Sequence, residues 1–224
     1  MRLILLKKNS RTASTVLNPI SNMINMKWEL RGAEFLSVKK SVIMVANHQS
    51  SLDILGMFAI WHTMGKVTVI AKREILYSGP FGLAAWLCGL VFINKKDVTE
   101  SRELMRVAME KLKRENIKLW VFPEGTRRNT GEIHEFKKGA FHLAIQTNTP
   151  IMPIVYSSYQ TFLNDKEKVF NPGEVIIEAL PEISTENYTT ENVDELMEKT
   201  RKMMDITFHK NSLEIKNRQR QRKV

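Results

Sequence analysis

The chain has 224 residues, 43% of them hydrophobic, which fits one domain with a sizeable core and excludes an intrinsically disordered protein. Its formal net charge is +10, and most of that charge lies in two segments without acidic residues, 1–11 and 216–224. The single cysteine, Cys88, excludes an intrachain disulfide and fits a protein whose body faces a reducing compartment.

Short apolar runs typical of buried strands alternate along the chain with amphipathic helical patterns. The predicted strands are residues 42–45, 67–71, 90–93, 118–122, 151–156 and 174–179. The predicted helices are residues 51–62, 99–114, 139–147 and 192–210, and residues 164–173 are expected to form a loop. The inner face of the second helix is expected to carry Leu104, Val107, Ala108 and Leu112. This alternation predicts an α/β fold with a mainly parallel central sheet flanked by helices.

By composition, residues 1–26 form a basic and amphipathic N-terminal segment, residues 27–210 form the folded domain, and residues 211–224 form a basic C-terminal tail. No segment has ~20 uninterrupted apolar residues, so no transmembrane span is predicted. Segment 16–24 carries an apolar helical stripe that suits a membrane interface, whereas segment 75–93 suits either an interface or the buried core. The basic ends of the chain indicate an anionic membrane surface, nucleic acid, or solvated termini.

The segment from Asn47 to Asp53 follows a predicted strand and opens a predicted helix. His48 and Asp53 are five residues apart in the sequence, so on one continuous helix they would lie on different faces. They meet only if the chain bends between them, which Ser50 or Ser51 would achieve by capping the helix. Asp53 would then fix the tautomer of the imidazole and leave its second nitrogen free to act as a base. The alternative is a loop histidine that caps or packs, because this spacing alone arises easily by chance.

Two other kinds of site are not indicated by the sequence. The serines beside His48 lack the Gly-x-Ser-x-Gly turn of serine hydrolases, so helix capping is the better interpretation. The remaining histidines form no cluster with metal-ligand spacing, and no metal is expected. They are His62, His134, His142 and His209.

A second motif, Phe-Pro-Glu-Gly-Thr-Arg-Arg at residues 122–128, also follows a predicted strand. Gly125 permits a tight turn with close approach of the backbone to a ligand, and Arg127 can hold phosphate oxygens in a bidentate manner. Glu124 would hold either Arg127 or a substrate hydroxyl. Further cations at the ends of predicted elements are the pairs Lys95-Lys96 and Lys137-Lys138. Together they predict an anionic substrate at the carboxyl edge of the sheet, and the alternative is a set of solvated turn charges.

Four ordered blocks resemble the motifs of the glycerolipid acyltransferases, and specifically of the 1-acyl-glycerol-3-phosphate acyltransferases. They are residues 47–53 with His-x4-Asp, residues 89–95, residues 122–127 with Phe-Pro-Glu-Gly-Thr-Arg, and the Pro-rich strand 149–154. The resemblance covers residues 27 to 180, and the first and third blocks together are highly specific. The second block departs from the family pattern, which usually ends in a pair that contains Arg. Here it ends in Asn94-Lys95, which keeps the charge but loses the planar guanidinium group.

This resemblance implies a glycerolipid acyltransferase fold and transfer of a fatty acyl group from acyl-CoA to the sn-2 hydroxyl of lysophosphatidic acid, forming phosphatidic acid. It implies that His48 is the general base, that Asp53 orients it, and that acyl-CoA is a co-substrate with no bound cofactor. The residues implied to bind substrate are Lys72, Lys95, Glu124, Gly125, Thr126, Arg127 and Lys138. The resemblance also implies a membrane surface as partner, typically the endoplasmic reticulum in animals, with the body facing the cytosol or the interface. No obligate protein partner is expected.

Relatives often begin with one or two membrane helices, and this sequence shows none. Either the chain is a shortened form, or its amphipathic start suffices for membrane contact. Three alternatives to the implied activity stay open: an acyltransferase for another lysophospholipid, an inactive lipid-binding relative, and a nucleic-acid-binding protein. The intact His48 and Asp53 pair weighs against an inactive relative. The nearly neutral interior without interleaved aromatic residues weighs against nucleic acid.

Overall fold

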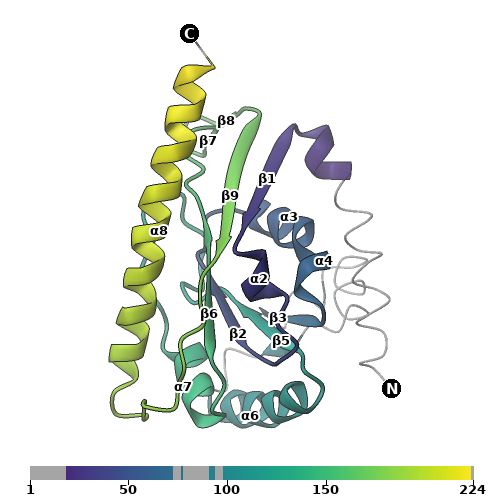
Figure 1. Cartoon of the computed structure of the whole chain (residues 1–224), viewed down its shortest axis with the longest axis vertical. Coiled ribbons are helices and arrows are strands. Elements are labelled where there is room, and N and C mark those ends of the chain that lie inside the picture. The colour runs from purple at the N-terminus through teal and green to yellow at the C-terminus, as the bar shows by residue number, and fades with distance from the viewer. Residues whose placement is uncertain (1–18, 73–76, 78–90, 94–97, 223–224) are drawn as a thin grey trace.

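The computed structural model describes residues 19–72, 77, 91–93 and 98–222, and it shows an α/β protein built around one seven-stranded sheet (Figure 1). From one edge to the other, the strands are β1 (Met26–Arg31), β9 (Gly173–Ala179), β6 (Ile151–Tyr156), β2 (Ile43–Ala46), β5 (Lys118–Val121), β3 (Val67–Lys72) and β4 (Val91–Ile93). All neighbouring pairs are parallel except β6 and β9, which are antiparallel. The predicted fold class, a mainly parallel central sheet flanked by helices, is therefore confirmed.

Helices cover both faces of this sheet. One layer consists of α2 (Ala33–Leu36), α3 (Leu52–Ala59) and α4 (Trp61–Met64), and the other of α6 (Val98–Arg114), α7 (Gly139–Gln146) and α8 (Val193–Gln221). Side chains alternate along a strand, and on β2 this alternation creates two cores. Ile43 and Val45 pack with α6, α7 and α8, whereas Met44 and Ala46 pack with α2, α3 and α4. Both faces of the central strands are therefore buried, as in other largely parallel sheets.

Two predicted helices have different bounds in the structure. The helix predicted over residues 51–62 is interrupted at Ile60, which separates α3 from α4. The helix predicted over residues 192–210 continues to Gln221, so α8 includes much of the basic C-terminal segment. None of the helices in the described part of the chain combines the length and the hydrophobicity needed to cross a membrane.

The inner face of α6 also differs from the prediction. It is formed by Met105, Met109 and Leu112, which are at most 8% exposed and follow the i, i+4, i+7 spacing of one helical face. The prediction that Val107 belongs to this face is wrong, because its side chain is 56% exposed. The side chain of Leu104 lies outside the described residues.

Two features of strand pairing were not predicted. The edge strand β1 pairs in parallel with β9 along its whole length. Its sequence, Met-Lys-Trp-Glu-Leu-Arg, mixes charged and apolar residues, and charged side chains are typical of sheet edges. The segment 164–173, predicted as a loop, takes part in a small antiparallel hairpin made of β7 (Leu163–Asn164) and β8 (Val169–Phe170).

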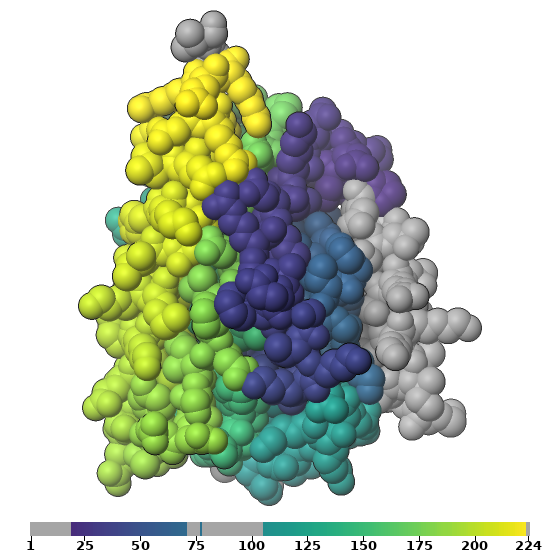
Figure 2. All heavy atoms as spheres, in the orientation of Figure 1, coloured from purple at the N-terminus to yellow at the C-terminus, as the bar shows by residue number. Residues whose placement is uncertain are grey.

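Ion pairs attach the C-terminal end of α8 to the edge of the sheet. Arg218 contacts Glu29 of β1 at 2.6 Å and Glu174 of β9 at 2.9 Å. Arg31 of β1 in turn contacts Glu214 of α8 at 2.7 Å. Figure 2 shows the yellow end of α8 packed beside the dark purple segment that contains β1. Part of the basic C-terminal charge is therefore neutralised within the domain.

A buried lysine links two short helices to the start of β5. Lys118 is 3% exposed, and its ammonium group donates hydrogen bonds to the carbonyl oxygens of Leu36 and Met64, each at 2.6 Å. These two residues end α2 and α4, so the ammonium group satisfies carbonyl groups at the negative ends of both helices. Burial lowers the pKa of Lys118 to about 8.

Candidate active site

His48 and Asp53 meet at the carboxyl end of β2. His48 lies in the loop that follows this strand, and Asp53 lies in the first turn of α3. The Nδ1 atom of the imidazole and the Oδ2 atom of the carboxylate are 2.7 Å apart. Because a carboxylate only accepts hydrogen bonds, the proton belongs on Nδ1, and Nε2 carries the free lone pair of a base. The structure thus brings together the two side chains predicted to be catalytic.

The bend that joins them is made by Asp53 itself. Its Oδ2 atom accepts hydrogen bonds from the backbone N–H groups of Gln49 at 2.8 Å and Ser50 at 3.0 Å. Ser51 occupies the N-cap position of α3, but its side chain makes no capping hydrogen bond, so the predicted capping by Ser51 is wrong. The Ser50 hydroxyl accepts only a long hydrogen bond, 3.4 Å, from the N–H of Leu52. A negative charge in the first helical turn is also favourable to the helix.

Two amide side chains fasten the loop after β2 to the neighbouring strand β6. Asn47 donates to the carbonyl oxygen of Tyr156 at 3.0 Å and accepts from the N–H of Tyr156 at 2.8 Å. Gln49 donates to the carbonyl oxygen of Ser157 at 3.0 Å and accepts from the N–H of Tyr159 at 3.2 Å. These bonds satisfy buried backbone groups beyond the β2–β6 ladder. Neither amide was predicted to have this role, although polar residues that flank a histidine directly after a buried strand are a usable signal.

The ring of His48 stacks on Phe122, the residue that follows β5. The two ring centroids are 3.9 Å apart, and the angle between the ring planes is 17°. Phe122 packs edge-to-face against Trp120, whose side chain is completely buried. The imidazole is therefore held on one edge by Asp53 and on one face by an aromatic ring that is itself supported by the core. The sequence contains Phe122 in its second motif, but no contact with His48 was predicted.

The segment 122–128 lies directly beside the histidine loop. The carboxylate of Glu124 accepts hydrogen bonds from the N–H of His48 at 2.7 Å and from the N–H of His134 at 3.3 Å. The N–H of Arg128 donates to the carbonyl oxygen of His48 at 3.0 Å. Burial raises the pKa of Glu124 to about 7, although these two amide hydrogen bonds and the charge of Arg128 act to lower it. The segment is therefore bonded to the backbone of His48 through the side chain of Glu124 and the main chain of Arg128.

A pocket of about 200 Å³ opens next to this segment. Its lining residues are Glu124, Arg128, His134, Glu135, Phe136 and Lys137. The side chain of Lys137 lies over Gly125, since a Cβ atom on Gly125 would be only 2.8 Å from the Nζ atom of Lys137. The φ angle of Gly125 is +68°, a conformation that favours glycine, and the missing Cβ atom leaves room for the flexible side chain of Lys137 against the turn. The pocket thus places two basic side chains, those of Arg128 and Lys137, beside the histidine loop.

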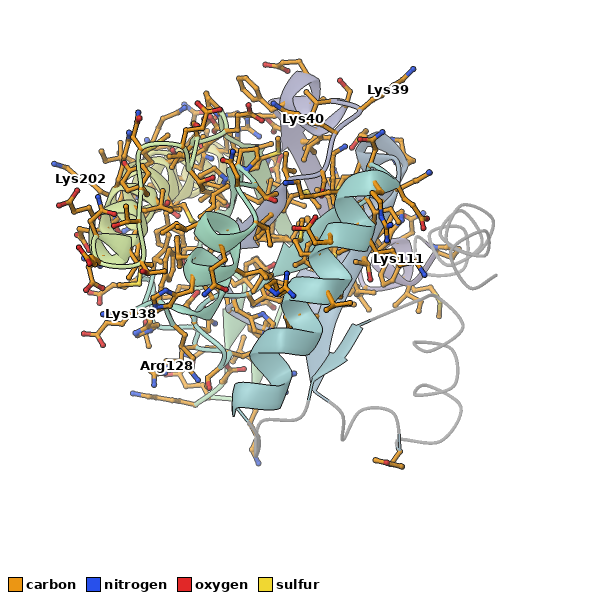
Figure 3. The ribbon with its side chains drawn as sticks, turned by 90° about the horizontal axis from the view of Figure 1, so that it is seen from below. Lys39, Lys40, Lys111, Arg128, Lys138 and Lys202 are labelled. Carbon is orange, nitrogen blue, oxygen red and sulfur yellow. The ribbon has the colours of Figure 1, made fainter. Side chains whose placement is uncertain are left out.

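Three other residues predicted to bind substrate, Thr126, Arg127 and Lys138, do not line this pocket. Thr126 and Arg127 are exposed, at the turn between Gly125 and Arg128. Lys138 forms an ion pair of 2.7 Å with Asp194 of α8 and does not line the pocket. Figure 3 shows Lys138 and Arg128 projecting from the same side of the molecule. The cation that lies against the turn is therefore Lys137, the sequence neighbour of the lysine that was predicted.

Two further predicted substrate-binding residues are not placed by the structure. Lys72 ends β3, but its side chain lies outside the described residues, as does the whole of Lys95. Their roles stay predictions. Within the ranges that the structure describes, no three His, Cys, Asp or Glu side chains are arranged to hold a metal ion.

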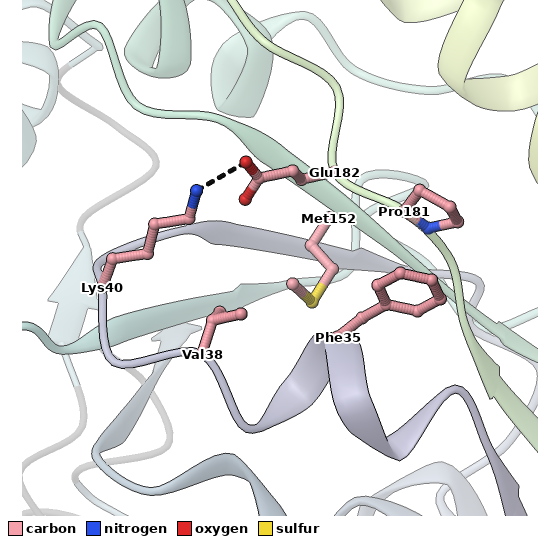
Figure 4. A pocket seen from close by; sticks show the side chains of 6 residues that line it. All are labelled: Phe35, Val38, Lys40, Met152, Pro181 and Glu182. Atoms are coloured by element: carbon pink, nitrogen blue, oxygen red, sulfur yellow. Dashed lines mark hydrogen bonds and ion pairs between the residues drawn. The ribbon is translucent and has the colours of Figure 1, made fainter.

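A larger pocket, of about 280 Å³, lies near the amino ends of β2 and β6 (Figure 4). Its lining residues are Phe35, Val38, Lys40, Met152, Pro181 and Glu182. Lys40 and Glu182 form an ion pair of 2.5 Å, and the other side chains of the lining are apolar. The lining of this pocket includes no residue of the histidine loop, whereas Glu124 and Arg128 of the smaller pocket bond to the backbone of His48, so the candidate active site is assigned to the edge of the sheet that carries His48.

Comparison with known proteins gives the family of this chain. The family model described as acyltransferase matches residues 27–157, a range that contains both His48 and Asp53. Human 1-acyl-sn-glycerol-3-phosphate acyltransferase alpha is 39% identical over 201 residues, which are 90% of this chain and 70% of that protein. The chain belongs to the 1-acyl-sn-glycerol-3-phosphate acyltransferase family. The human beta protein is also 39% identical to this acyltransferase, over 183 residues that are 82% of this chain and 65% of the relative.

A solved structure has the same fold as this acyltransferase. The 1-acyl-sn-glycerophosphate (LPA) acyltransferase PlsC from Thermotoga maritima superposes with a TM-score of 0.71 and covers 93% of this chain and 78% of its own. The two sequences are 21% identical, so this likeness supports the fold alone. The family resemblance inferred from the motifs is thus confirmed by the sequence comparisons, and the fold class by this structure.

Proposed function

We propose that this acyltransferase moves a fatty acyl group from acyl-CoA to the sn-2 hydroxyl of lysophosphatidic acid, with phosphatidic acid and coenzyme A as products. The observation that carries the proposal is the 2.7 Å contact between His48 and Asp53, next to a turn with basic side chains. The names of the human relatives support the choice of acceptor, because both relatives are named for 1-acyl-sn-glycerol-3-phosphate.

In the proposed mechanism His48 is the general base. Its Nε2 atom removes the proton from the acceptor hydroxyl, whose oxygen attacks the carbonyl carbon of the thioester. A C–O bond forms, the C–S bond breaks, and the proton passes from Nε2 to the departing thiolate of coenzyme A. Asp53 keeps the imidazole in the reactive tautomer and stabilises its protonated form. The base contributes roughly 10²–10⁴-fold to the rate, and positioning of the two substrates supplies much of the rest.

The phosphate of the acceptor is proposed to bind near the turn that contains Gly125. Arg127 lies exposed at this turn, while Arg128 and Lys137 line the adjacent pocket. Guanidinium and ammonium groups form charge-assisted hydrogen bonds with phosphate oxygens. Glu124 supports the turn by holding the backbone of the histidine loop. Thr126, Lys72 and Lys95 stay predicted contacts from the family pattern, whereas Lys138 is paired with Asp194 and is not assigned to the phosphate site.

We further propose that this acyltransferase works at a membrane surface, on the endoplasmic reticulum with its body facing the cytosol or the interface. Both proposed substrates carry long acyl chains, so the enzyme must reach lipid. Ile20 and Met23, in the helical turn before β1, are 38% and 82% exposed, which supports apolar contact of this part of the chain with lipid.

Flotation of the purified protein with liposomes tests this contact, and Met23→Lys should reduce the bound fraction. Equal flotation of both proteins would contradict a role for Met23.

An acyl-transfer assay of the purified chain tests the proposed activity. Oleoyl-CoA is supplied with lysophosphatidic acid, or with lysophosphatidylcholine or lysophosphatidylethanolamine at the same concentration. Release of coenzyme A is followed with a thiol reagent, and the lipid product is identified by mass spectrometry. We expect phosphatidic acid from the first acceptor and no turnover by His48→Ala, whose circular dichroism should match the unmodified protein. Turnover of only another lysophospholipid would overturn the choice of acceptor, and an active His48→Ala protein would overturn the role of the base.

A further inference from the structure

One oxygen atom of the Asp53 carboxylate is left without a hydrogen bond. Asp53 is completely buried, and its Oδ2 atom is bonded to the imidazole of His48 and to the N–H groups of Gln49 and Ser50. Its Oδ1 atom has no hydrogen-bond partner among the described residues. An ionised carboxylate can accept about four hydrogen bonds, and a buried oxygen without any is unfavourable. Oδ1 therefore needs a donor that the loop itself does not supply.

The hydroxyl group of Tyr159 lacks a partner in the same region. Tyr159 is completely buried, and no described residue makes a hydrogen bond of ordinary geometry with its hydroxyl. Its backbone N–H donates to Gln49 at 3.2 Å, and the N–H of Gln49 donates to Asp53, so the three residues are connected. Burial raises the pKa of Tyr159 well above its usual value, and the charge of Asp53 and its interaction with the hydroxyl add to the effect. The phenol is therefore neutral at physiological pH and available as a donor.

We propose that Tyr159 is a positioning residue whose hydroxyl donates to Oδ1 of Asp53, either directly or through one buried water molecule. This bond satisfies two buried polar atoms at once, and it fixes the carboxylate on the side opposite to His48. A donor to the carboxylate also draws part of its negative charge away from the imidazole. Tyr159 thus sets both the orientation of Asp53 and the strength with which Asp53 attracts the proton of His48. This inference rests on the proposed role of His48 as the base.

Other charged or titratable groups also act on this pair. The carboxylate of Glu124 is bonded to the backbone of His48. The positive charge of Arg128 acts to lower the pKa of Glu124. The hydroxyl of Tyr156 donates to the backbone carbonyl oxygen of Asp53 at 3.0 Å. Tyr156 is, like Tyr159, completely buried, but its hydroxyl touches the main chain of Asp53 instead of the carboxylate. A test of the proposal therefore has to leave these groups in place and change only the donor to Oδ1.

The substitution Tyr159→Phe, with Tyr156→Phe as matched control, makes this change. The protein is labelled with ¹⁵N-histidine, the signal of His48 is assigned by its loss in His48→Ala, and the imidazole is titrated by NMR. We expect His48 to titrate at higher pH in Tyr159→Phe than in the unmodified protein, because the carboxylate then holds the imidazole proton more strongly. In Tyr156→Phe, His48 should titrate at the same pH as in the unmodified protein. In the acyl-transfer assay, Tyr159→Phe should lower kcat about tenfold at unchanged KM, the effect of one charge-assisted hydrogen bond.

Incorporation of 3-fluorotyrosine at position 159 gives a second, independent test that preserves the packing of the ring. The fluorinated phenol is the stronger donor, so His48 should titrate at lower pH, opposite to the effect of Tyr159→Phe. An unchanged titration in both Tyr159 proteins, or the same shift in Tyr156→Phe, would overturn the proposal. Because NMR titration needs no turnover, this result is separate from the outcome of the acyl-transfer assay.

Discussion

The imidazole of His48 lies nearly parallel to the ring of Phe122, with 3.9 Å between the ring centroids. Since Asp53 holds only one edge of the imidazole, the stack with Phe122 fixes the plane in which Nε2 points. Replacement of Phe122 by leucine keeps an apolar side chain at this position but removes the flat ring on which the imidazole stacks.

We therefore expect Phe122→Leu to lower kcat about tenfold, because small errors in the position of a base are costly in rate. KM for both substrates should stay within about twofold, since the phenylalanine orients the base and does not bind the acceptor. Phe122→Tyr, which keeps the stacked ring, is the control in steady-state kinetics and should retain most of the rate. Equal losses in the two variants would show that the flat ring is not the feature that matters.

The neighbouring lysines 137 and 138 offer a matched pair for the phosphate site. Lys137 lies over Gly125 and lines the pocket, whereas Lys138 is paired with Asp194. Lys137→Gln should raise KM for lysophosphatidic acid about tenfold, the effect of one charge-assisted contact, and Lys138→Gln should change it little. Measurement of KM for each substrate in turn decides whether this pocket binds the phosphate of lysophosphatidic acid or a phosphate of acyl-CoA. A rise confined to acyl-CoA would assign the pocket to coenzyme A, and no rise would exclude a role in binding.

The buried carboxylate of Glu124 should make stability depend on pH. Its pKa is about 7 in the folded protein and near 4.5 when unfolded, so the folded state holds the proton more tightly between these values. The free energy of unfolding should therefore fall as pH rises from 4.5 to 7, by on the order of 3 kcal/mol. Urea denaturation at pH 5 and pH 7 measures this fall, which Glu124→Gln should largely remove. Glu135→Gln, at an exposed position of the same pocket, should retain it.

Lys118 should have an effect of the opposite sign at alkaline pH. Its pKa is about 8 in the folded protein against 10.5 for an ordinary lysine, so between these values the unfolded chain binds more protons. The free energy of unfolding contributed by this group should therefore rise from pH 8 to pH 10.5, by on the order of 3 kcal/mol. We expect Lys118→Met to lack this rise when compared with the unmodified protein by denaturation. Lys66→Met, which removes a half-buried ammonium group bonded to one carbonyl oxygen, should retain it.

Most of the fold was predictable because apolar periodicity depends on local sequence. Strands such as β2 and β6, buried on both faces, are continuous apolar runs, and helices such as α7 lie between them. The edge strand β1 was not predictable, since its mixed sequence becomes a strand only by pairing with β9, which is far away along the chain. The length of α8 was also missed, because its last turns are polar and are held by Arg218 and its acidic partners.

The site was predictable only where the motif spacing implied a definite geometry. His48 and Asp53 were identified because a strand, a bend and a helix place them together. The stack with Phe122 was not predictable, since motif order does not tell which side chains of two loops face each other. In the same way, nothing in the sequence distinguishes Lys137 from Lys138. Their directions depend on the turn at residue 125 and on a carboxylate of α8.

The amide groups of Asn47 and Gln49 recognise only main-chain atoms of the segment that begins with Tyr156. Any amino acid other than proline presents those same atoms, so mutation of a strand side chain need not loosen this fastening. During evolution, residues of this segment that do not touch the acid–base pair can therefore vary while proton transfer is retained. The position of the catalytic base thus depends on the path of the neighbouring main chain, and much less on which side chains that strand carries.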